Sequence, residues 1–376
     1  MRVLLLFFLL IPSVTTRGDE VDNAIVAIGK AGPQGKGAAA ARLAARRLAK
    51  RGVEIVPRIF EALDTPNVVA ANWYRTALEQ IIEAELARPK PKLPLAFLKK
   101  YARQPKRQGR PRRFAMSLLS RLEPKFVRQL IPTLIHDPEF RQEAINEQIK
   151  LGDALKKAGK KRQAVKVFSQ SFKAARESGQ ISGLAGRLKS LGQKVSIIDH
   201  MGFINRWYLL GPFDAPGTSG FTTSFPPERR VDLKAKYTGQ RGDIRWRLHQ
   251  TKGNMAQLNL IQSIAATKEA VGYAYTEVHS PRTQNVQVRC GADDNLTIWV
   301  NGKKVLARLQ WLNGIRLDRF TAPVQLRKGA NRVLVKICQG PQHKNPAVPN
   351  NWSMQLRFCD QTGASVGAKV TIPAPK

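Results

Sequence analysis

The spacing of apolar residues changes near residue 200, and this change most constrains how the chain can fold. Before it, apolar residues recur at intervals of three and four residues, Ala and Leu are abundant, and Pro and Gly interrupt the chain often. That pattern is typical of short amphipathic helices. From Trp207 onward, short runs alternate apolar and polar residues, as strands with one buried face do. The sequence predicts a multidomain α plus β protein, with an N-terminal α-solenoid of short helical repeats followed by a C-terminal antiparallel β-sandwich.

The length of the chain, 376 residues, exceeds that of one ordinary domain. We place the helical-repeat domain at residues 19–196 and the β-sandwich at residues 203–376. The first residues form a separate segment, in which one arginine precedes an apolar run from Val3 to Ile11 and a stretch of small residues. This is the pattern of a secretory signal peptide, which we place at residues 1–16. The alternative is a buried N-terminal helix.

The charge of the chain indicates what kind of partner it has. Lys and Arg number 63 and Asp and Glu number 27, so the formal net charge is +36. Such a surplus attracts polyanions, including nucleic acid, anionic lipid and acidic polysaccharide. Export would make the protein secreted, periplasmic or part of the cell envelope, and would favour a glycan or another polyanion over nucleic acid. No later segment is apolar enough to predict a transmembrane span.

Two stretches of the helical half share a layout. In each, an amphipathic helix contains a proline and ends at a polar break before another proline, at Leu63-Asp64-x-Pro66 and at Ile135-x-Asp137-Pro138. This layout resembles HEAT-type repeats. Residues 148–175 resemble a tetratricopeptide unit, in which small residues let two helices cross closely. The matching positions are Leu151, Gly152, Gly159, Ala164 and Phe168. Both resemblances imply an interaction scaffold and not a catalytic domain.

A basic tract runs from Arg88 to Arg128, with fourteen positive residues and one negative residue, Glu123. One interpretation is a surface that binds a polyanion, and the alternative is a solvated loop and helix face in a chain that is basic throughout. Few aromatic residues for base stacking accompany the tract, which makes nucleic acid the less favoured partner. The candidate binding residues are Lys99, Lys100, Arg103, Lys106, Arg107, Arg110, Arg112 and Arg113.

The β half contains a recognisable order of strands and turns. A strand over residues 285–290 leads through a turn to a strand over 296–300, and Asn301-Gly302 follows as a type I′ hairpin turn. This layout, over about Tyr273 to Cys359, resembles the galactose-binding-like jelly roll and the protective-antigen-type domain. Secreted bacterial proteins that join helical repeats to such a sandwich have a similar layout. The resemblance implies a jelly-roll sandwich that binds carbohydrate or packs against a protein partner of the envelope.

Three residues of the β half are candidates for carbohydrate binding. Trp311 and Trp352 lie in or beside predicted loops, where an indole ring can stack on a sugar, and Asn301 lies in the hairpin turn. The alternative for the two tryptophans is packing over the open ends of the sandwich. Trp299 lies between Ile298 and Val300, so it points outward if those two residues point into the core.

Asp293 and Asp294 are candidate ligands for a calcium ion, and no other cofactor is expected. The protective-antigen-type resemblance implies this role, because an Asp pair precedes the hairpin in that family. Calcium binds six to eight oxygens, so two carboxylates alone are too few. The alternative is a turn in which the Asp side chains bond to the backbone.

Cys338 and Cys359 each close a strand and share the same alternation phase. After export they would suit a disulfide between strands. Two buried, unreactive thiols are the alternative.

The sequence lacks several common catalytic motifs. The chain has no G-x-S-x-G, H-E-x-x-H or Cys-x-x-Cys, and its Gly-rich stretch lacks the Ser or Thr of a P-loop. We therefore predict an exported, non-catalytic binding protein, whose sandwich recognises a glycan or acidic polysaccharide beside a basic helical scaffold. The alternatives are a cell-envelope scaffold held by charge, and charge-driven binding of nucleic acid.

Overall fold

The structure is a computed structural model that describes residues 17–311, 314–345 and 351–372. It divides into two compact units, Met1–Glu147 and Gln148–Lys376, here called the helical unit and the sandwich unit. The predicted signal peptide at residues 1–16 lies outside the described residues. Within the described ranges, the helices are all too short or too polar to cross a membrane.

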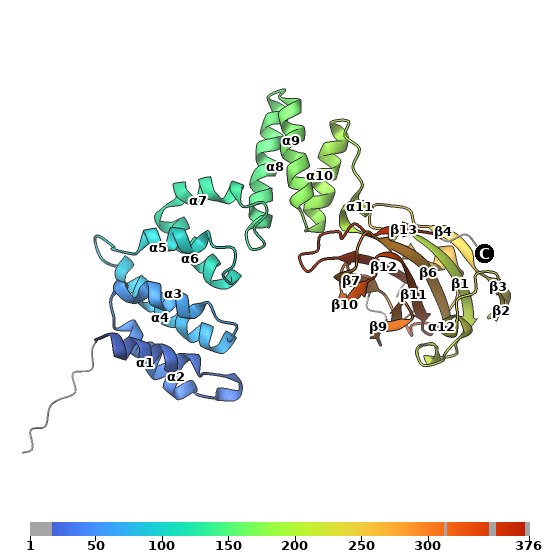
Figure 1. Cartoon of the computed structure of the whole chain (residues 1–376), viewed down its shortest axis with the longest axis horizontal. Helices are drawn as coiled ribbons and strands as arrows, with labels where there is room; N and C mark the ends of the chain where they lie inside the picture. Colours follow the sequence, from blue (N-terminus) through green and yellow to red (C-terminus); the bar gives the residue numbers. More distant parts are fainter. Residues whose placement is uncertain (1–16, 312–313, 346–350, 373–376) are drawn as a thin grey trace, which may run out of the picture. The chain divides into compact units, whose positions relative to one another are not determined.

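The helical unit consists of consecutive helices that pack in pairs, α1 with α2, α3 with α4, and α5 with α6 (Figure 1). Each helix buries one face because its apolar residues recur at helical spacing, as Val56, Ile59, Phe60 and Leu63 do in α3. The helices are α1 (Arg17–Gly29), α2 (Ala38–Ala49), α3 (Val56–Leu63), α4 (Val68–Leu86), α5 (Leu95–Ala102), α6 (Gly109–Leu122), α7 (Pro124–Leu130) and α8 (Arg141–Lys157), with short 3-10 helices at Pro33–Gly35, Val53–Ile55 and Ile131–Thr133.

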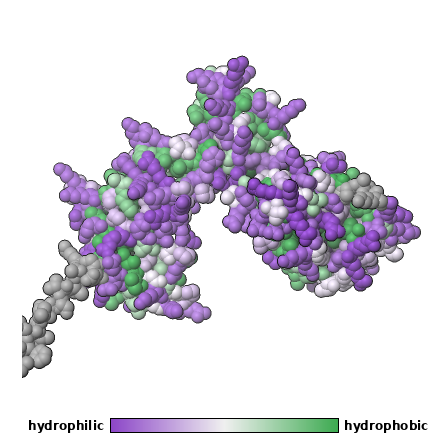
Figure 2. Space-filling view, viewed as in Figure 1, coloured by the Kyte–Doolittle hydropathy of each residue, from purple (hydrophilic) through white to green (hydrophobic). Residues whose placement is uncertain are grey.

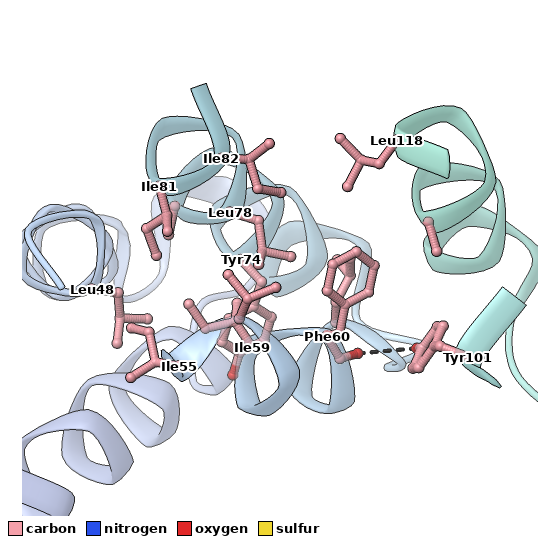
Figure 3. Packing of buried hydrophobic residues seen from close by; sticks show 14 of the residues in the cluster. Leu48, Ile55, Ile59, Phe60, Tyr74, Leu78, Ile81, Ile82, Tyr101 and Leu118 are labelled. Carbon is pink, nitrogen blue, oxygen red and sulfur yellow. Dashed lines mark hydrogen bonds between the residues drawn. The ribbon is translucent and has the colours of Figure 1, made fainter. Parts of the chain in front are cut away.

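Buried polar groups tie these pairs into one core. Figure 3 shows the aromatic ring of Phe60 among the buried side chains of the cluster, with Tyr101 beside it. The Tyr101 hydroxyl donates to the Phe60 carbonyl at 3.0 Å, and the Tyr74 hydroxyl donates to the Ile25 carbonyl at 2.6 Å. These bonds satisfy two hydroxyls that would otherwise be buried without partners, and they link helices that are far apart in the sequence.

The sandwich unit begins with the end of α8 and the helices α9 (Lys161–Ala174), α10 (Ser178–Ser190) and α11 (Ile197–Met201). The predicted close crossing of two helices is present: a Cβ added to Gly152 would lie 2.3 Å from Cε1 of Phe168. Gly159, with φ of +75°, makes the turn between α8 and α9. The helical hairpin of the tetratricopeptide-like stretch is therefore real, while membership of a repeat family stays a resemblance.

The rest of the sandwich unit is two packed antiparallel sheets and a small two-stranded sheet of β2 and β3, which confirms the predicted fold class. The large sheet has the order β4-β1-β6-β11-β8-β9 with β13 on β6, and the small sheet has the order β10-β7-β12-β5. The strands are β1 (Arg206–Asp214), β2 (Lys236–Gly239), β3 (Gly242–Arg245), β4 (Arg247–Gln250), β5 (Leu258–Asn259), β6 (Ala270–Ser280), β7 (Gln284–Ala292), β8 (Leu296–Val300), β9 (Lys303–Arg308), β10 (Phe320–Leu326), β11 (Gly329–Gln339), β12 (Ser353–Cys359) and β13 (Lys369–Thr371).

The large sheet is covered on both faces. Its inner face packs against the small sheet through residues such as Ile298 and Val300. On its outer face a second cluster forms around Tyr273, Tyr275 and Leu334. The chain between β1 and β4 contributes to this cluster, and it contains β2, β3 and the short helix α12 (Pro226–Arg229). A further short helix, α13 (Leu260–Ser263), follows β5. The outer layer makes β6 and β11 almost wholly buried.

The change from helix to strand lies between Met201 and Arg206, whereas the division into compact units lies earlier, at Glu147. The buried guanidinium of Arg357 explains why α11 belongs with the sandwich. It donates to the Met201 carbonyl at 3.1 Å and to Asp318 Oδ1 at 2.8 Å. One side chain of the small sheet thus holds the end of the helical segment.

The predicted disulfide between Cys338 and Cys359 is wrong, because both residues are free and buried. Cys338 lies on β11 of the large sheet and packs in its outer cluster. Cys359 lies on β12 of the small sheet and follows Phe358, whose ring is in the core between the sheets. Successive strands of a sandwich often lie in different sheets, so a shared alternation phase does not bring their side chains together. Burial raises the pKa of the Cys338 thiol to about 12, which leaves it protonated and unreactive.

Candidate functional site

A groove of about 440 Å³ lies on the outer face of the large sheet. One wall is the segment Pro227–Val231, which contains part of α12, and the floor is formed by side chains of β6, β8 and β11. The residues that matter for its chemistry are Arg229, Arg230, Tyr275, Trp299, Arg332 and Leu334.

The floor of the groove is apolar and aromatic because these side chains form one row across neighbouring strands. Leu334 is paired with Tyr275 on one side and with Trp299 on the other, and Trp299 is paired with Lys304. Ile298 and Val300 point into the core, so Trp299 points outward, as the alternation of the strand predicts. The Trp299 ring is half-buried, and the Lys304 ammonium lies 5.9 Å from its centre. The floor thus contains an indole ring with one cation, more distant than the two at Phe126, lying over it.

The rim of the groove carries arginines without acidic partners. Arg229, Arg230 and Arg332 are exposed, and among the residues that the structure describes none of the three takes part in an ion pair. The two carboxylates beside these arginines, Glu228 and Glu277, already accept hydrogen bonds from other side chains. Glu228 accepts from the Lys336 ammonium at 2.8 Å, and Glu277 accepts from the Tyr275 hydroxyl at 2.8 Å. The groove therefore presents a surplus of positive charge beside an aromatic floor, although Glu277 lies opposite Arg332 on the neighbouring strand.

The wall that contains α12 is held by a buried charge. The Lys336 side chain is almost fully buried, and its ammonium donates to Glu228 and to the Thr223 carbonyl. The Tyr273 hydroxyl donates to the same Glu228 oxygen. Burial, together with this bond, raises the pKa of Tyr273, so the phenol keeps its proton and stays a donor. The network fixes the wall against the sheet and leaves Glu228 no free role in the groove.

The prediction that Trp352 stacks on a sugar is wrong. Trp352 is 0% exposed, its Nε1 donates to the Ile337 carbonyl at 3.3 Å, and its ring packs between the sheets. A Cβ added to Gly272 would lie 3.0 Å from Cζ2 of the ring, which shows how closely the large sheet approaches it. Trp352 is a core residue because the strand β12 begins directly after it and continues the buried face.

Trp311 and Asn301 have positions that differ from Trp352. Trp311 is half-buried, packs against the outer cluster and lies close to Gly340, beside residues 312–313, which are not described. Asn301 and Gly302 have φ of +53° and +81°, which confirms the predicted turn. Asn301 Nδ2 donates to Asn331 at 2.9 Å, and its Oδ1 accepts from the Arg332 amide at 3.0 Å. Asn301 thus holds the backbone of Arg332 at the groove rim.

Asp293 and Asp294 are buried near the end of β7. Oδ2 of Asp293 has no hydrogen-bond partner within the described part of the chain, and burial raises the pKa of this carboxyl. Oδ2 of Asp294 accepts from the Gly340 amide at 3.4 Å, and Oδ1 of Asn295 accepts from the Gln310 amide. No group of three or more acidic, His or Cys residues in the described ranges is arranged to hold a metal. The described donors alone are too few for calcium, so calcium binding stays a prediction.

The basic tract is divided by the structure into structural and solvent-facing residues. The prediction that Arg112 binds a polyanion is wrong: its guanidinium is buried, donates to both oxygens of Asp137 at 3.0 and 2.6 Å, and donates to the Ala102 carbonyl. Three more of the predicted residues pair with acids, as Lys99 does with Glu123, Arg107 with Glu61 and Asp64, and Arg113 with Glu139 and Glu143. Lys100, Arg103, Lys106 and Arg110 are exposed and have no ion pair within the described ranges.

The sequence contained part of the signal for the groove. Arg332 and Leu334 alternate with the core residues Val333 and Val335, so their outward direction follows from the period of two. Arg229 and Arg230 had no such signal. They reach the groove because a long connection between β1 and β4 folds back over the sheet, and no local pattern predicts that path.

Comparisons with known proteins identify no family for this chain. No protein-family model matches it, and no curated protein matches it. Among solved structures, an anti-sigma factor domain-containing protein is 12% identical with a TM-score of 0.25, and the alignment covers 46% of each chain. The present chain therefore spans less than half the length of that protein.

Two further solved structures show the same low similarity. The PA14 domain of an antifreeze protein is 12% identical over 49% of this chain and 98% of that one, with a TM-score of 0.24. A β-glucosidase from Kluyveromyces marxianus is 10% identical over 46% of this chain and 21% of that one, with a TM-score of 0.27. Superpositions this loose carry no inference about the function of the present chain.

Proposed function

We propose that this protein is a non-catalytic binding protein whose sandwich unit binds an acidic saccharide in the groove on the outer face of the large sheet. The observation that carries the proposal is the combination of a flat ring, Trp299, with three exposed arginines that have no acidic partner in the described chain. A neutral ligand would use the ring alone. A ligand with a carboxylate or sulfate on a sugar ring would use both features.

The chemistry of the two parts is complementary. The C–H face of a pyranose ring packs on an indole ring, which provides apolar contact area with little loss of side-chain freedom. A guanidinium presents a planar fork of donors that matches carboxylate and sulfate oxygens. A hydrogen bond to a charged group contributes about 1.5–3 kcal/mol when it is shielded from water. Arg332 is well placed for this contact because it lies two residues before Leu334, on the same face of β11 as the Tyr275–Leu334–Trp299 row.

The use of the nearby carboxylates supports binding without catalysis. Hydrolysis of a glycosidic bond generally requires two carboxyl groups that face the bond across a cleft. In this groove Glu228 is engaged by Lys336 and Tyr273, and Glu277 is engaged by Tyr275. Export through the segment at residues 1–16, and a place at the cell envelope, belong to the same proposal, because acidic polysaccharides are abundant there.

A glycan panel tests the proposal on the full-length chain. We expect binding of oligosaccharides that carry uronate or sulfate, and a loss of about tenfold or more in affinity in Trp299→Ala. The matched control is Leu248→Ala. Leu248 is an exposed apolar residue on the same outer face, joined to the row through Tyr208, but outside the groove. Equal effects of the two substitutions, or no selective binding by the wild type, would exclude the groove as the site.

The second candidate function is a scaffold held on an anionic envelope surface, or on nucleic acid, by charge alone. The net charge of +36 favours it. Under that function affinity falls steeply as salt rises and Trp299→Ala has no effect, because many released counterions and no ring contact provide the free energy of binding. The salt titration of wild type and Trp299→Ala therefore separates the two functions.

A further inference from the structure

Most acidic side chains of the helical unit form ion pairs with cations of the same unit. The pairs extend from Arg51–Glu20 and Arg58–Asp22 among the first helices to Arg113–Glu143 at the end of the unit. Hydrophilic residues cover most of the visible face of this unit (Figure 2). With its acids already paired, the remaining cations of the unit face solvent without compensation, and their positions decide where an external anion binds.

One of these cations, Arg103, lies over an aromatic ring of α7 together with the paired Lys99. The Arg103 guanidinium lies 4.7 Å from the centre of the Phe126 ring, and the Lys99 ammonium lies 5.1 Å from it. Phe126 is half-buried. Next to it on α7, Lys125 and Arg128 are exposed and have no ion pair in the described ranges.

Lys100 on α5 and Arg103, which directly follows this helix, are likewise exposed and without an ion pair among the described residues. The acid of this region is Glu123, and it already pairs with Lys99 at 2.7 Å. We call the group Lys100, Arg103, Lys125, Phe126 and Arg128 the Phe126 patch.

We infer that the Phe126 patch is a second anion-binding surface, separate from the groove, which binds a linear acidic polysaccharide with a negative group on each repeat. The Cβ atoms of residues three or four apart on a helix lie about 5–6 Å from one another, close to the length of one sugar residue. Lys100 with Arg103, and Lys125 with Arg128, have this spacing. A chain with one carboxylate or sulfate per sugar can therefore pair with successive side chains of α5 and α7. The inference does not depend on the proposed function of the groove.

Two observations favour a polysaccharide over the other common polyanions. Single-stranded nucleic acid binds through bases stacked on open aromatic rings, but the ring here is already covered by Arg103 and Lys99. A helix that lies on a membrane needs an apolar face for the lipid. The large apolar residues exposed in the described part of the helical unit are Val26, Leu43 and Val68, which lie on α1, α2 and α4 and not at the patch.

The test uses the full-length chain and dextran sulfate, with unsulfated dextran as the neutral probe. In the patch variant, Lys100→Gln, Arg103→Gln, Lys125→Gln and Arg128→Gln remove four exposed cations. The matched control removes four exposed cations without ion pairs from α2 and its end, by Arg42→Gln, Arg46→Gln, Arg47→Gln and Lys50→Gln. Both variants lower the net charge by the same amount, so they differ only in the part of the helical unit that loses its cations. Circular dichroism verifies that each variant is folded.

We expect the patch variant to lose about tenfold or more in affinity for dextran sulfate, and its slope of log affinity against log salt to fall by about one for each contact removed. The α2 variant should change affinity by less than about threefold, a modest effect of net charge alone. Equal losses in the two variants, or equal binding of unsulfated dextran, would overturn the inference. Tighter binding of duplex DNA or of anionic lipid vesicles than of dextran sulfate, lost in the same patch variant, would overturn the assignment to a polysaccharide.

Trp299→Ala, measured in parallel, separates this surface from the groove. Because the Phe126 patch does not contain Trp299, we expect dextran sulfate to retain its patch-dependent binding in that variant. If the patch variant binds normally while Trp299→Ala does not, the patch inference fails and the groove proposal stands. If the opposite holds, the groove proposal fails and the patch remains.

Discussion

The helical unit and the sandwich unit have a surplus of the same charge but arrange it differently. In the helical unit, most acids pair with cations at the surface, as in Arg75–Glu79, and one pair, Arg112–Asp137, is buried. In the sandwich unit, acids such as Glu228 and Asp318 hold buried cations. The arginines at the groove are left without partners, next to aromatic rings. Under the proposed function, the same surplus of positive charge gives a salt-sensitive surface in the helical unit and an anion-binding groove in the sandwich unit.

The two tryptophans Trp352 and Trp299 give the largest expected contrast. Because Trp352 fills the core between the sheets, Trp352→Ala should lower the free energy of unfolding by about 3–5 kcal/mol. Trp299 is half-buried on the outer face, so Trp299→Ala should lower it by only about 1 kcal/mol. Urea denaturation measures both. Similar losses would show that Trp299 is a core residue and not the floor of a binding groove.

A second contrast compares one ion pair from each unit. Glu228→Gln leaves the buried Lys336 ammonium without its counterion and should lower the free energy of unfolding by up to about 3 kcal/mol. Glu79→Gln removes the partner of the exposed Arg75 and should lower it by about 0.3–0.5 kcal/mol. Thermal denaturation of the two variants measures the difference. If Glu228→Gln lowered the free energy of unfolding no more than Glu79→Gln does, the buried ion pair would not hold the groove wall.

The pH dependence of stability should come partly from His200 of the sandwich unit. Burial lowers the pKa of His200 below its ordinary value of 6.5, and the charges of Arg176 and Arg357 act in the same direction. Because the folded state favours the neutral ring, the stabilisation is complete above pH 6.5 and is lost as the pH falls below that value. We expect the melting temperature of the wild type to fall between neutral pH and pH 5 and His200→Gln to reduce that fall. The control is His136→Gln, at an exposed position of the helical unit. An unchanged fall in His200→Gln would contradict the account.

The last prediction concerns the buried carboxyl of Asp293. Burial raises the pKa of its carboxyl above the ordinary value of 3.8, so stability is greatest below that pH and decreases as the pH rises through the folded-state pKa. Asp293→Asn should therefore leave stability at neutral pH unchanged or raise it by up to about 1 kcal/mol. Melting temperatures with and without calcium extend the test. A rise with calcium in the wild type, absent in Asp293→Asn and Asp294→Asn, would establish the calcium site, whereas a marked loss of stability in Asp293→Asn without calcium would contradict this account.

Local patterns predicted much of the fold. The change of period near residue 200 separated helices from strands, Asn301-Gly302 marked a hairpin turn, and Gly152 with Phe168 marked a close helix crossing. Each of these features depends on a few residues near one another in the chain. The assignment of strands to sheets does not, which is why the disulfide between Cys338 and Cys359 was predicted wrongly.

The candidate site was harder to predict because charge and loop position are poor guides to exposure. Arg112 looked like one more cation of the basic tract, yet it shares a helix face with Ala115, Met116 and Leu119, which is the pattern of a buried position. Trp352 follows two asparagines, so the sequence predicted a loop residue. In the structure its indole nitrogen instead donates to the Ile337 carbonyl of β11 inside the core. Arg229 and Arg230 depend on the path of a long connection, which only the structure provides.

Because exposed arginines lie beside Trp299 in the groove, the protein should distinguish acidic from neutral saccharides. The measurement is the ratio of affinities for two oligosaccharides that differ only at C6, which is a carboxylate carbon in one and a hydroxymethyl carbon in the other. It is made on the wild type and on the triple variant Arg229→Gln, Arg230→Gln and Arg332→Gln. We predict a preference for the acidic ligand of about tenfold or more in the wild type and nearly none in the variant, which keeps its weak affinity for the neutral ligand through Trp299. A triple variant that retains the full preference would contradict the account.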